Sequence, residues 1–253
     1  INAVNDNSAV RPVKVSPEVF KMLEKAMTGA ELTFGTFDPT IEPLWRYYKN
    51  NQNPSSAQIS AAVRRINYEK ISTVPEFQTI FFSQASTRLS FDFLKKGYSM
   101  DMLAKELQRN GVRSASFVAG STALAMGKEK LNIVLAHPDD PAKKLAIFNL
   151  KNNALCTINT AKDPFYSRHS EWLPTLRAQK GVTNNLIPVL VGVQAPNALT
   201  AEVLAQALFI LGPEKGIPLL SSLKYDGYYI SRDDAGNLQL KTTASLKNKF
   251  KNI

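Results

Sequence analysis

Ala195-Pro196-Asn197-Ala198-Leu199-Thr200-Ala201-Glu202-Val203-Leu204-Ala205-Gln206-Ala207-Leu208-Phe209-Ile210-Leu211-Gly212 is the stretch that joins a predicted strand to a predicted helix. The apolar run at 186–193 is typical of a buried strand, and the apolar spacing of 200–211 is typical of a helix. A separation of four residues places Glu202 and Gln206 one helical turn apart on the same face. Two oxygen ligands can converge on one ion there. The alternative is a pair of polar side chains on a water-exposed helix surface.

The composition is that of a folded globular chain, with 44% hydrophobic and 21% charged residues among 253. This length can bury one sizeable core, or one core with a small appended lobe. No apolar run reaches the roughly 20 residues that span a bilayer. The sequence opens without the basic and apolar segments of a signal peptide. The single cysteine, Cys156, cannot form an internal disulfide, and we expect it to be a small buried hydrophobe.

The formal net charge is +10, with lysines and arginines spread along the chain. Such a spread predicts a solvated basic surface, which could attract anionic lipid, a phosphate-rich cofactor or an acidic partner. No basic motif interleaved with aromatic residues is present, so the pattern argues against nucleic-acid binding.

Helices and strands follow from caps, breakers and periodicity. Ser16-Pro17 predicts a helix start, and Ser55 or Ser56 predicts another, whose helix reaches Ile66. Asp38-Pro39 and Glu42-Pro43 are expected to break helical structure. Two further helices are predicted, one over 97–110 that Gly111 ends and one over 200–211. After a break at Gly212-Pro213, a short helix is predicted to reach Leu220. The predicted strands cover 79–82, 86–91, 115–119, 131–136, 145–150, 154–158, 186–193, 228–231 and 238–240. This order predicts a mixed α+β fold with mainly antiparallel sheets.

Two further blocks stand upstream in the same order and spacing as those of a known family. They are Gly35-Thr36-Phe37-Asp38-Pro39-Thr40-Ile41-Glu42-Pro43-Leu44 and Arg88-Leu89-Ser90-Phe91-Asp92-Phe93-Leu94-Lys95-Lys96-Gly97-Tyr98-Ser99-Met100-Asp101. With 195–212 they make the chain resemble the FAD:protein FMN transferases, or ApbE-like thiamine-biosynthesis lipoproteins, from about Val13 to Gly216. The resemblance implies one ApbE-like α+β domain over 1–253, without the family's first strand and helix. It also implies a bacterial protein that is exported to the periplasm and often held to the membrane by a lipid anchor.

The resemblance further implies an activity and a set of site residues. Members of the family bind FAD with a divalent metal, usually magnesium, and transfer FMN to a threonine or serine of an acceptor protein. Carried over by position, the metal ligands would be Glu202 and Gln206, and no residue is assigned as catalytic. The cofactor-binding positions would be Thr36, Phe37, Asp38, Ser90, Lys96, Leu173 and Thr175.

The chain departs from the family pattern at several of these positions. Glu202 and Gln206 stand for an aspartate and a threonine, and magnesium requires near-octahedral oxygen ligands. These two changes favour the water-exposed alternative slightly. Elsewhere Ser90 and Thr122 replace acids, Phe93 replaces a glycine, and the segment 172–177 stands where a motif with histidine and aspartate is expected.

Two hypotheses therefore remain open. In the first, the chain is a divergent FAD:protein FMN transferase that uses Asp38, Lys96, Glu202 and Gln206. In the second, it is a non-catalytic structural or binding subunit on the same scaffold, as the altered positions suggest. Structural roles compete with ligand binding at three positions: Phe37 could be a core anchor, Asp38 a turn former and Lys96 a surface lysine.

Overall fold

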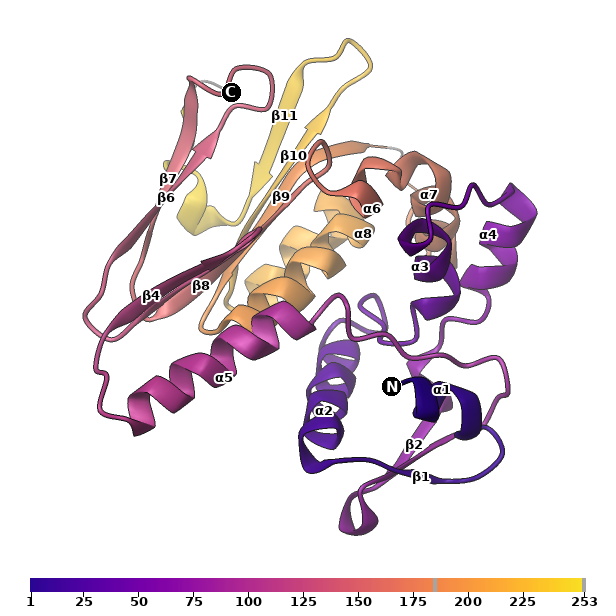
Figure 1. The fold of residues 1–253 in the computed structure, drawn as a ribbon. Helices are drawn as coiled ribbons and strands as arrows, with labels where there is room; N and C mark the ends of the chain where they lie inside the picture. The colour runs from indigo at the N-terminus through magenta and orange to yellow at the C-terminus, as the bar shows by residue number, and fades with distance from the viewer. Residues whose placement is uncertain (184–185, 252–253) are drawn as a thin grey trace. The chain divides into compact units, whose positions relative to one another are not determined.

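The computed structural model describes residues 1–183 and 186–251 (Figure 1). Its helices are α1 (Asn2–Asn7), α2 (Pro17–Leu32), α3 (Glu42–Lys49), α4 (Ser56–Val63), α5 (Lys95–Arg109), α6 (Pro164–Ser167), α7 (His169–Gln179) and α8 (Ala198–Ser222). Its strands are β1 (Val13–Lys14), β2 (Ile71–Val74), β3 (Thr79–Phe82), β4 (Ala115–Ala119), β5 (Thr122–Met126), β6 (Leu131–Ala136), β7 (Lys144–Leu150), β8 (Asn153–Asn159), β9 (Ile187–Ala195), β10 (Asp226–Arg232) and β11 (Leu238–Thr242). The predicted α+β class is confirmed.

The chain divides into two compact units. Unit 1 comprises residues 1–92 and 171–180, and unit 2 comprises 93–170 and 181–253. The short segment 171–180, most of α7, thus returns to the unit formed by the start of the chain. The single family domain over 1–253 stays a prediction.

Unit 1 combines helices with a small antiparallel sheet of order β1-β3-β2. The predicted helix starts are confirmed: the Ser16 hydroxyl accepts a hydrogen bond from the Val19 N–H at 3.4 Å, and Ser55 and Gln58 form a capping box. Helix α7 contributes Trp172 and Leu173, which are both buried. This segment is therefore a core helix of unit 1.

Unit 2 is built on a six-stranded antiparallel sheet of order β11-β10-β9-β8-β5-β4. Helix α8 packs against β8, β9 and β10, and α5 packs against α8 and β5 (Figure 1). The hairpin β6-β7 joins a separate hydrophobic cluster with the sheet, in which Phe148 stacks on Tyr228 at 5.5 Å between ring centroids. Adjacent residues of a strand face opposite sides, so Ala123 points to this cluster and Thr122 points to α8.

Helix α8 is long and apolar enough, by length and composition, to cross a membrane, but 67% of its most apolar window is buried in the fold. This burial is the pattern of a core helix. Gly212 interrupts helix α8 with φ 70° and ψ 177°, directly before Pro213. The predicted break at Gly212-Pro213 is thereby confirmed, and the second part runs to Ser222.

Three predictions about elements are wrong. Residues 86–91 do not form a strand; the Leu89 N–H donates instead to Asn5 Oδ1 at 2.7 Å, and the Ser90 N–H donates to the Pro39 carbonyl at 2.9 Å. Glu42-Pro43 begins α3, because proline is tolerated in the first turn of a helix. Helix α4 ends at Val63, before the predicted end at Ile66. In addition, strands β1, β2 and β5 were not predicted; β5 lies between β4 and β8.

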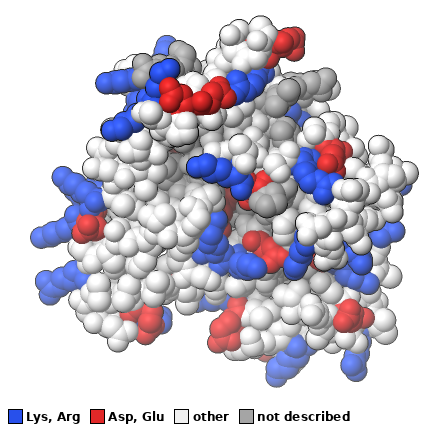
Figure 2. Space-filling model, turned by 45° about the horizontal axis from the view of Figure 1, so that its top comes forward, with Lys and Arg blue, Asp and Glu red and all other residues white. Residues whose placement is uncertain are grey.

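One face of the surface carries dispersed basic residues. On the face drawn in Figure 2, Lys and Arg side chains lie in several separate groups, with Asp and Glu among them. This arrangement agrees with the solvated surface that the sequence predicts.

Candidate functional site

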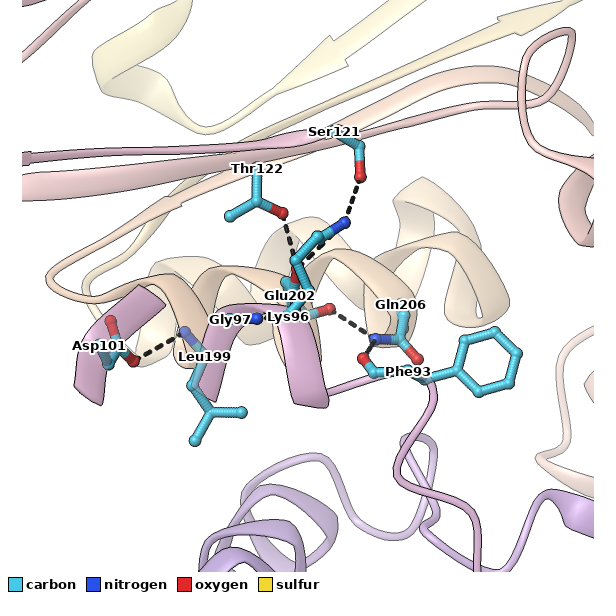
Figure 3. Close-up of polar contacts among 9 residues, drawn as sticks. All are labelled: Phe93, Lys96, Gly97, Asp101, Ser121, Thr122, Leu199, Glu202 and Gln206. Carbon is cyan, nitrogen blue, oxygen red and sulfur yellow. Dashed lines mark hydrogen bonds and ion pairs between the residues drawn. The ribbon is translucent and has the colours of Figure 1, made fainter. Parts of the chain in front are cut away.

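Glu202, in the first turns of α8, is the centre of a buried polar cluster in unit 2 (Figure 3). The residue is only 3% exposed, so the water-exposed alternative is wrong for it. Its Oε1 accepts a hydrogen bond from Thr122 Oγ1 at 2.7 Å and lies 3.2 Å from Lys96 Nζ. Its Oε2 accepts a hydrogen bond from the Gly97 N–H at 2.8 Å. Both carboxylate oxygens are therefore engaged within the protein.

Lys96 lies between this carboxylate and the solvent. Its Nζ also donates to Ser121 Oγ at 2.8 Å (Figure 3). The Lys96 side chain is 37% exposed, against 4% for the side chain of Glu202. Lys96 is thus a partly exposed residue that also forms an ion pair, and its side chain is the more exposed member of that pair.

Gly97 allows α5 and α8 to approach closely. A Cβ at this position would lie 2.7 Å from Glu202 Oε2 and 2.8 Å from the Ala198 carbonyl oxygen. Both distances are shorter than van der Waals contact, and one of the two atoms belongs to the backbone. A glycine is therefore required here for the hydrogen bond between Glu202 and the Gly97 N–H.

The two helices cap each other. The N–H groups of the first turn of a helix have no partner within the helix. Glu202 of α8 accepts one from Gly97 of α5, and Asp101 of α5 accepts that of Leu199 of α8 at 3.0 Å (Figure 3). Asp101 also accepts the N–H of Ala198 at 2.8 Å. Burial raises the pKa of Asp101, although these two hydrogen bonds oppose the rise. The negative side chains thus fix the two helix starts side by side.

Gln206 extends the cluster by one turn of α8. Its Nε2 donates to the Phe93 carbonyl at 2.7 Å and to the Glu202 carbonyl at 3.1 Å. The Phe93 ring packs against Phe165 and Tyr166, with ring centroids 5.0 and 6.5 Å away. The aromatic side chain at this glycine position of the family is therefore part of an aromatic cluster.

The side chains of Glu202 and Gln206, as they are arranged here, do not fit as ligands of a magnesium ion. Magnesium binds oxygen ligands, usually with carboxylate charge and retained water. The Glu202 carboxylate is paired with Lys96, and the Gln206 amide presents its N–H groups to two carbonyls. Within 1–183 and 186–251, no group of three or more His, Cys, Asp or Glu could hold a metal. The metal assignment of Glu202 and Gln206 stays a prediction.

Cys156 lies opposite Thr122 in the pairing of β5 with β8. Burial raises the pKa of its thiol to about 12, and the Glu202 charge adds to the rise. The thiol is protonated and buried, as expected of a small core residue.

The predicted residues at 36–38 belong to unit 1 and are buried there. Asp38 Oδ1 accepts hydrogen bonds from the Thr40 N–H and hydroxyl at 2.8 and 2.6 Å, and Oδ2 accepts one from the Tyr68 N–H at 2.9 Å. Burial raises the pKa of Asp38 above that of a free aspartate. Phe37 is 3% exposed and Thr36 is buried. Asp38 is thus a turn-forming residue and Phe37 a core residue, and their contact with flavin stays a prediction.

The remaining predicted positions also lie in unit 1. Ser90 is buried, and its hydroxyl accepts a hydrogen bond from the Asp92 N–H at 3.2 Å. Asp92 in turn accepts one from Trp45 Nε1 at 2.7 Å. Leu173 is buried and Thr175 half-buried on α7. Their flavin contacts are likewise untested predictions.

Sequence reasoning missed the roles of three residues. The sequence identifies Thr122 only as the replacement of an acid, and it assigns no role to Ser121 or Asp101. The signal for Asp101 was its place four residues after Gly97, which is one turn along the same face of a helix.

Comparison with known proteins places the chain in a family. The profile of the ApbE family matches residues 1–229. The FAD:protein FMN transferase of Haemophilus influenzae is 21% identical over 98% of this chain and 76% of its own length, and that of Buchnera aphidicola is 25% identical over 79% of this chain and 63% of its own length. The crystal structure of the apo form of the flavinyl transferase ApbE from Pseudomonas stutzeri superposes with a TM-score of 0.80 at 22% identity, covering 99% of this chain and 80% of that chain. The order of the three sequence blocks, the antiparallel fold and the match over most of the chain agree, and this chain belongs to the ApbE family.

Proposed function

We propose that this chain is a flavin-handling protein that binds FAD weakly and transfers FMN to a protein hydroxyl slowly or not at all. The observation that carries the proposal is the closed cluster around Glu202, in which both carboxylate oxygens already accept internal donors. The relatives that it matches are named FAD:protein FMN transferases. The family scaffold supports flavin binding, and the cluster argues for weakened chemistry.

Lys96 is the residue that we assign to the anionic part of FAD. An ammonium carries three donors, and the Lys96 Nζ directs two of them at Glu202 and Ser121. The third is available to a phosphate oxygen, and the side chain is partly exposed. One ammonium gives less charge than a divalent ion, so we expect an affinity in the micromolar range or weaker.

The transfer reaction makes demands that the cluster does not meet. The acceptor oxygen of a serine or threonine must form a bond to the FMN phosphorus while the pyrophosphate bond breaks and AMP leaves. The hydroxyl proton must pass to a base. Glu202 accepts hydrogen bonds from Thr122 and Gly97 and pairs with Lys96, so it is poorly placed to take that proton.

The second candidate function is a non-catalytic subunit that binds a protein partner. It is favoured by the same engagement of Glu202, because a carboxylate that serves to join α5 and α8 has a structural role. On this reading the family scaffold remains while flavin binding is lost. Under both proposals the protein acts on or binds another protein, and under both it is exported.

Two measurements test the proposal. Titration calorimetry with FAD should give a dissociation constant of micromolar order or weaker, and Lys96→Met should weaken it at least tenfold. Lys95→Met, at an exposed neighbouring position, is the matched control. Submicromolar affinity would contradict the weak site, and no binding would favour the non-catalytic subunit.

The transfer itself is tested by mass spectrometry. The protein is incubated with FAD, magnesium and a flavin-acceptor domain, with a relative named FAD:protein FMN transferase as positive control. We expect little or no covalent FMN on the acceptor. A stoichiometric adduct would restore full transferase function.

A further inference from the structure

We infer that the junction of α5 and α8 handles its ligand without a divalent cation, because Lys96 Nζ and Gln206 Nε2 occupy the oxygens that such an ion would need. The part of this inference that concerns ligand binding rests on the proposed function. The part that concerns the ion rests on the cluster alone.

The first argument is the saturation of Glu202. Thr122 Oγ1 and the Gly97 N–H lie 2.7 and 2.8 Å from its two oxygens, which are normal hydrogen-bond distances. An ion on Oε1 would have to displace both Thr122 and Lys96. An ion on Oε2 would leave the buried Gly97 N–H without its acceptor, and an unsatisfied buried donor is unfavourable.

The second argument is charge. The Lys96 ammonium, 3.2 Å from Oε1, already compensates the Glu202 carboxylate. A divalent ion beside this pair would gain one carboxylate and meet one ammonium, so the local charge would favour its remaining in water. The ammonium thus takes the place of the ion, on a side chain that is 37% exposed.

The third argument is the Gln206 amide. The nitrogen is identified by its chemistry, since both atoms near it are carbonyl oxygens, at 2.7 and 3.1 Å. A carbonyl oxygen is a usual ligand of a hard cation, and here an N–H donor has taken that of Phe93. Gln206 and Glu202, one turn apart on α8, together hold the chain at the start of α5.

The ion is tested first and without any flavin. Manganese(II) is added to the full chain, and its free electron paramagnetic resonance signal is followed. We expect no saturable site at the cluster: either no ion binds, or Glu202→Gln and Glu106→Gln retain binding equally. Glu106 is an exposed carboxylate on α5 and serves as the matched control. One manganese per chain that is lost in Glu202→Gln and kept in Glu106→Gln would overturn the inference.

The ligand is tested second. FAD binding is measured with excess EDTA and with millimolar magnesium, and we expect dissociation constants that agree within about twofold. Binding that is tenfold or more tighter with magnesium would overturn the inference. If FAD binds under neither condition, the proposed function fails, and the manganese experiment still decides the question of the ion. The wild-type titrations need no variant, so a variant that does not fold leaves the test intact.

Discussion

Gly97 shows at the scale of one residue how the cluster depends on a missing side chain. Its hydrogen atom leaves room for Glu202 Oε2 and the Ala198 carbonyl, which a Cβ would meet at 2.7 and 2.8 Å. The requirement is spatial, because the residue lies within the helical part of α5.

We expect Gly97→Ala to destabilise the protein by about 1–3 kcal/mol, since α5 and α8 would have to move apart. Alanine has a higher helix propensity than glycine, and this small gain in stability offsets part of the steric cost. Urea unfolding measures the change. Ser99→Ala, exposed on the same helix, should change stability by less than about 0.5 kcal/mol. Equal stabilities for the two variants would contradict the close approach.

Thr122 provides the second prediction at this scale. Its hydroxyl donates to a carboxylate at 2.7 Å, and both groups are buried. We expect Thr122→Val to cost about 1–3 kcal/mol, because Glu202 loses a donor without access to water. Thr122→Ser keeps the hydroxyl and should lose markedly less stability. If valine and serine prove equivalent in urea unfolding, the hydrogen bond to Glu202 does not stabilise the fold.

At the scale of elements, the reciprocal capping of α5 and α8 makes pH a probe of the fold. Burial raises the pKa of Asp101 above 3.8, whereas a hydrogen bond from Lys143 lowers the pKa of Asp140, whose side chain is 41% exposed. A raised pKa in the folded state means that the contribution of this carboxyl is fully present below its unfolded pKa. That contribution is lost as the pH rises through the folded pKa.

We therefore expect wild type to lose stability relative to Asp101→Asn as the pH rises from about 3.8 through the folded pKa of Asp101. Urea unfolding of both proteins across this window measures the difference. Carboxyl carbon NMR gives the direct test, in which Asp101 titrates at higher pH than Asp140. The reverse order would show that Asp101 is not buried against α8.

The spacing of Glu202 and Gln206 on α8 permits a gain of function. Glu202→Asp with Gln206→Thr shortens both side chains, withdraws the carboxylate from Lys96 and removes the amide donor to Phe93. We expect magnesium to raise the thermal midpoint of this double variant, because an ion that binds only the folded state stabilises it. Each single change should do less, since magnesium keeps its waters unless several ligands replace them.

Phe93→Gly is added if the double variant shows no response, because the ring could fill the space. A triple variant that folds normally and ignores magnesium would show that this part of α8 is not a place where an ion can bind. Wild type should show no magnesium-dependent midpoint.

At the scale of the whole molecule, the two units carry separate natural probes. Both tryptophans, Trp45 and Trp172, belong to unit 1, and the single cysteine, Cys156, belongs to unit 2. The thiol is buried, so it reacts with a disulfide reagent only when unit 2 opens. Tryptophan fluorescence and thiol reactivity thus follow different units.

Leu44→Ala removes most of a fully buried side chain in unit 1. We expect it to lower the free energy of unfolding, as followed by tryptophan fluorescence in urea, by about 2–5 kcal/mol. The thiol transition should shift much less, since unit 2 has its own hydrophobic cluster. Leu103→Ala, at an exposed position of α5, is the control that should move neither. Equal shifts in both probes would mean that the units unfold as one.

The sequence by itself determined the features whose causes are local. Ser16 and Ser55 cap helices because their hydroxyls reach N–H groups three residues ahead, and Gly212-Pro213 breaks α8 because of its backbone geometry. Strands β4 and β6 have the predicted bounds, since period and turn residues define them. Family membership also followed from the order of the three blocks.

Only the tertiary structure decided what the site residues do. Glu202 meets Thr122 and Gly97 across 80 and 105 residues of sequence, and Asp101 meets Ala198 across 97. A helical period cannot tell whether its polar face is covered by another helix, and so exposure was wrongly favoured for Glu202. The strand predicted at 86–91 is wrong for the same reason, because pairing depends on distant neighbours. A strand must pair with another strand, and the Leu89 N–H donates instead to the side chain of Asn5. Burial, pairing and charge compensation depend on neighbours that are distant in the chain, and folding alone brings them together.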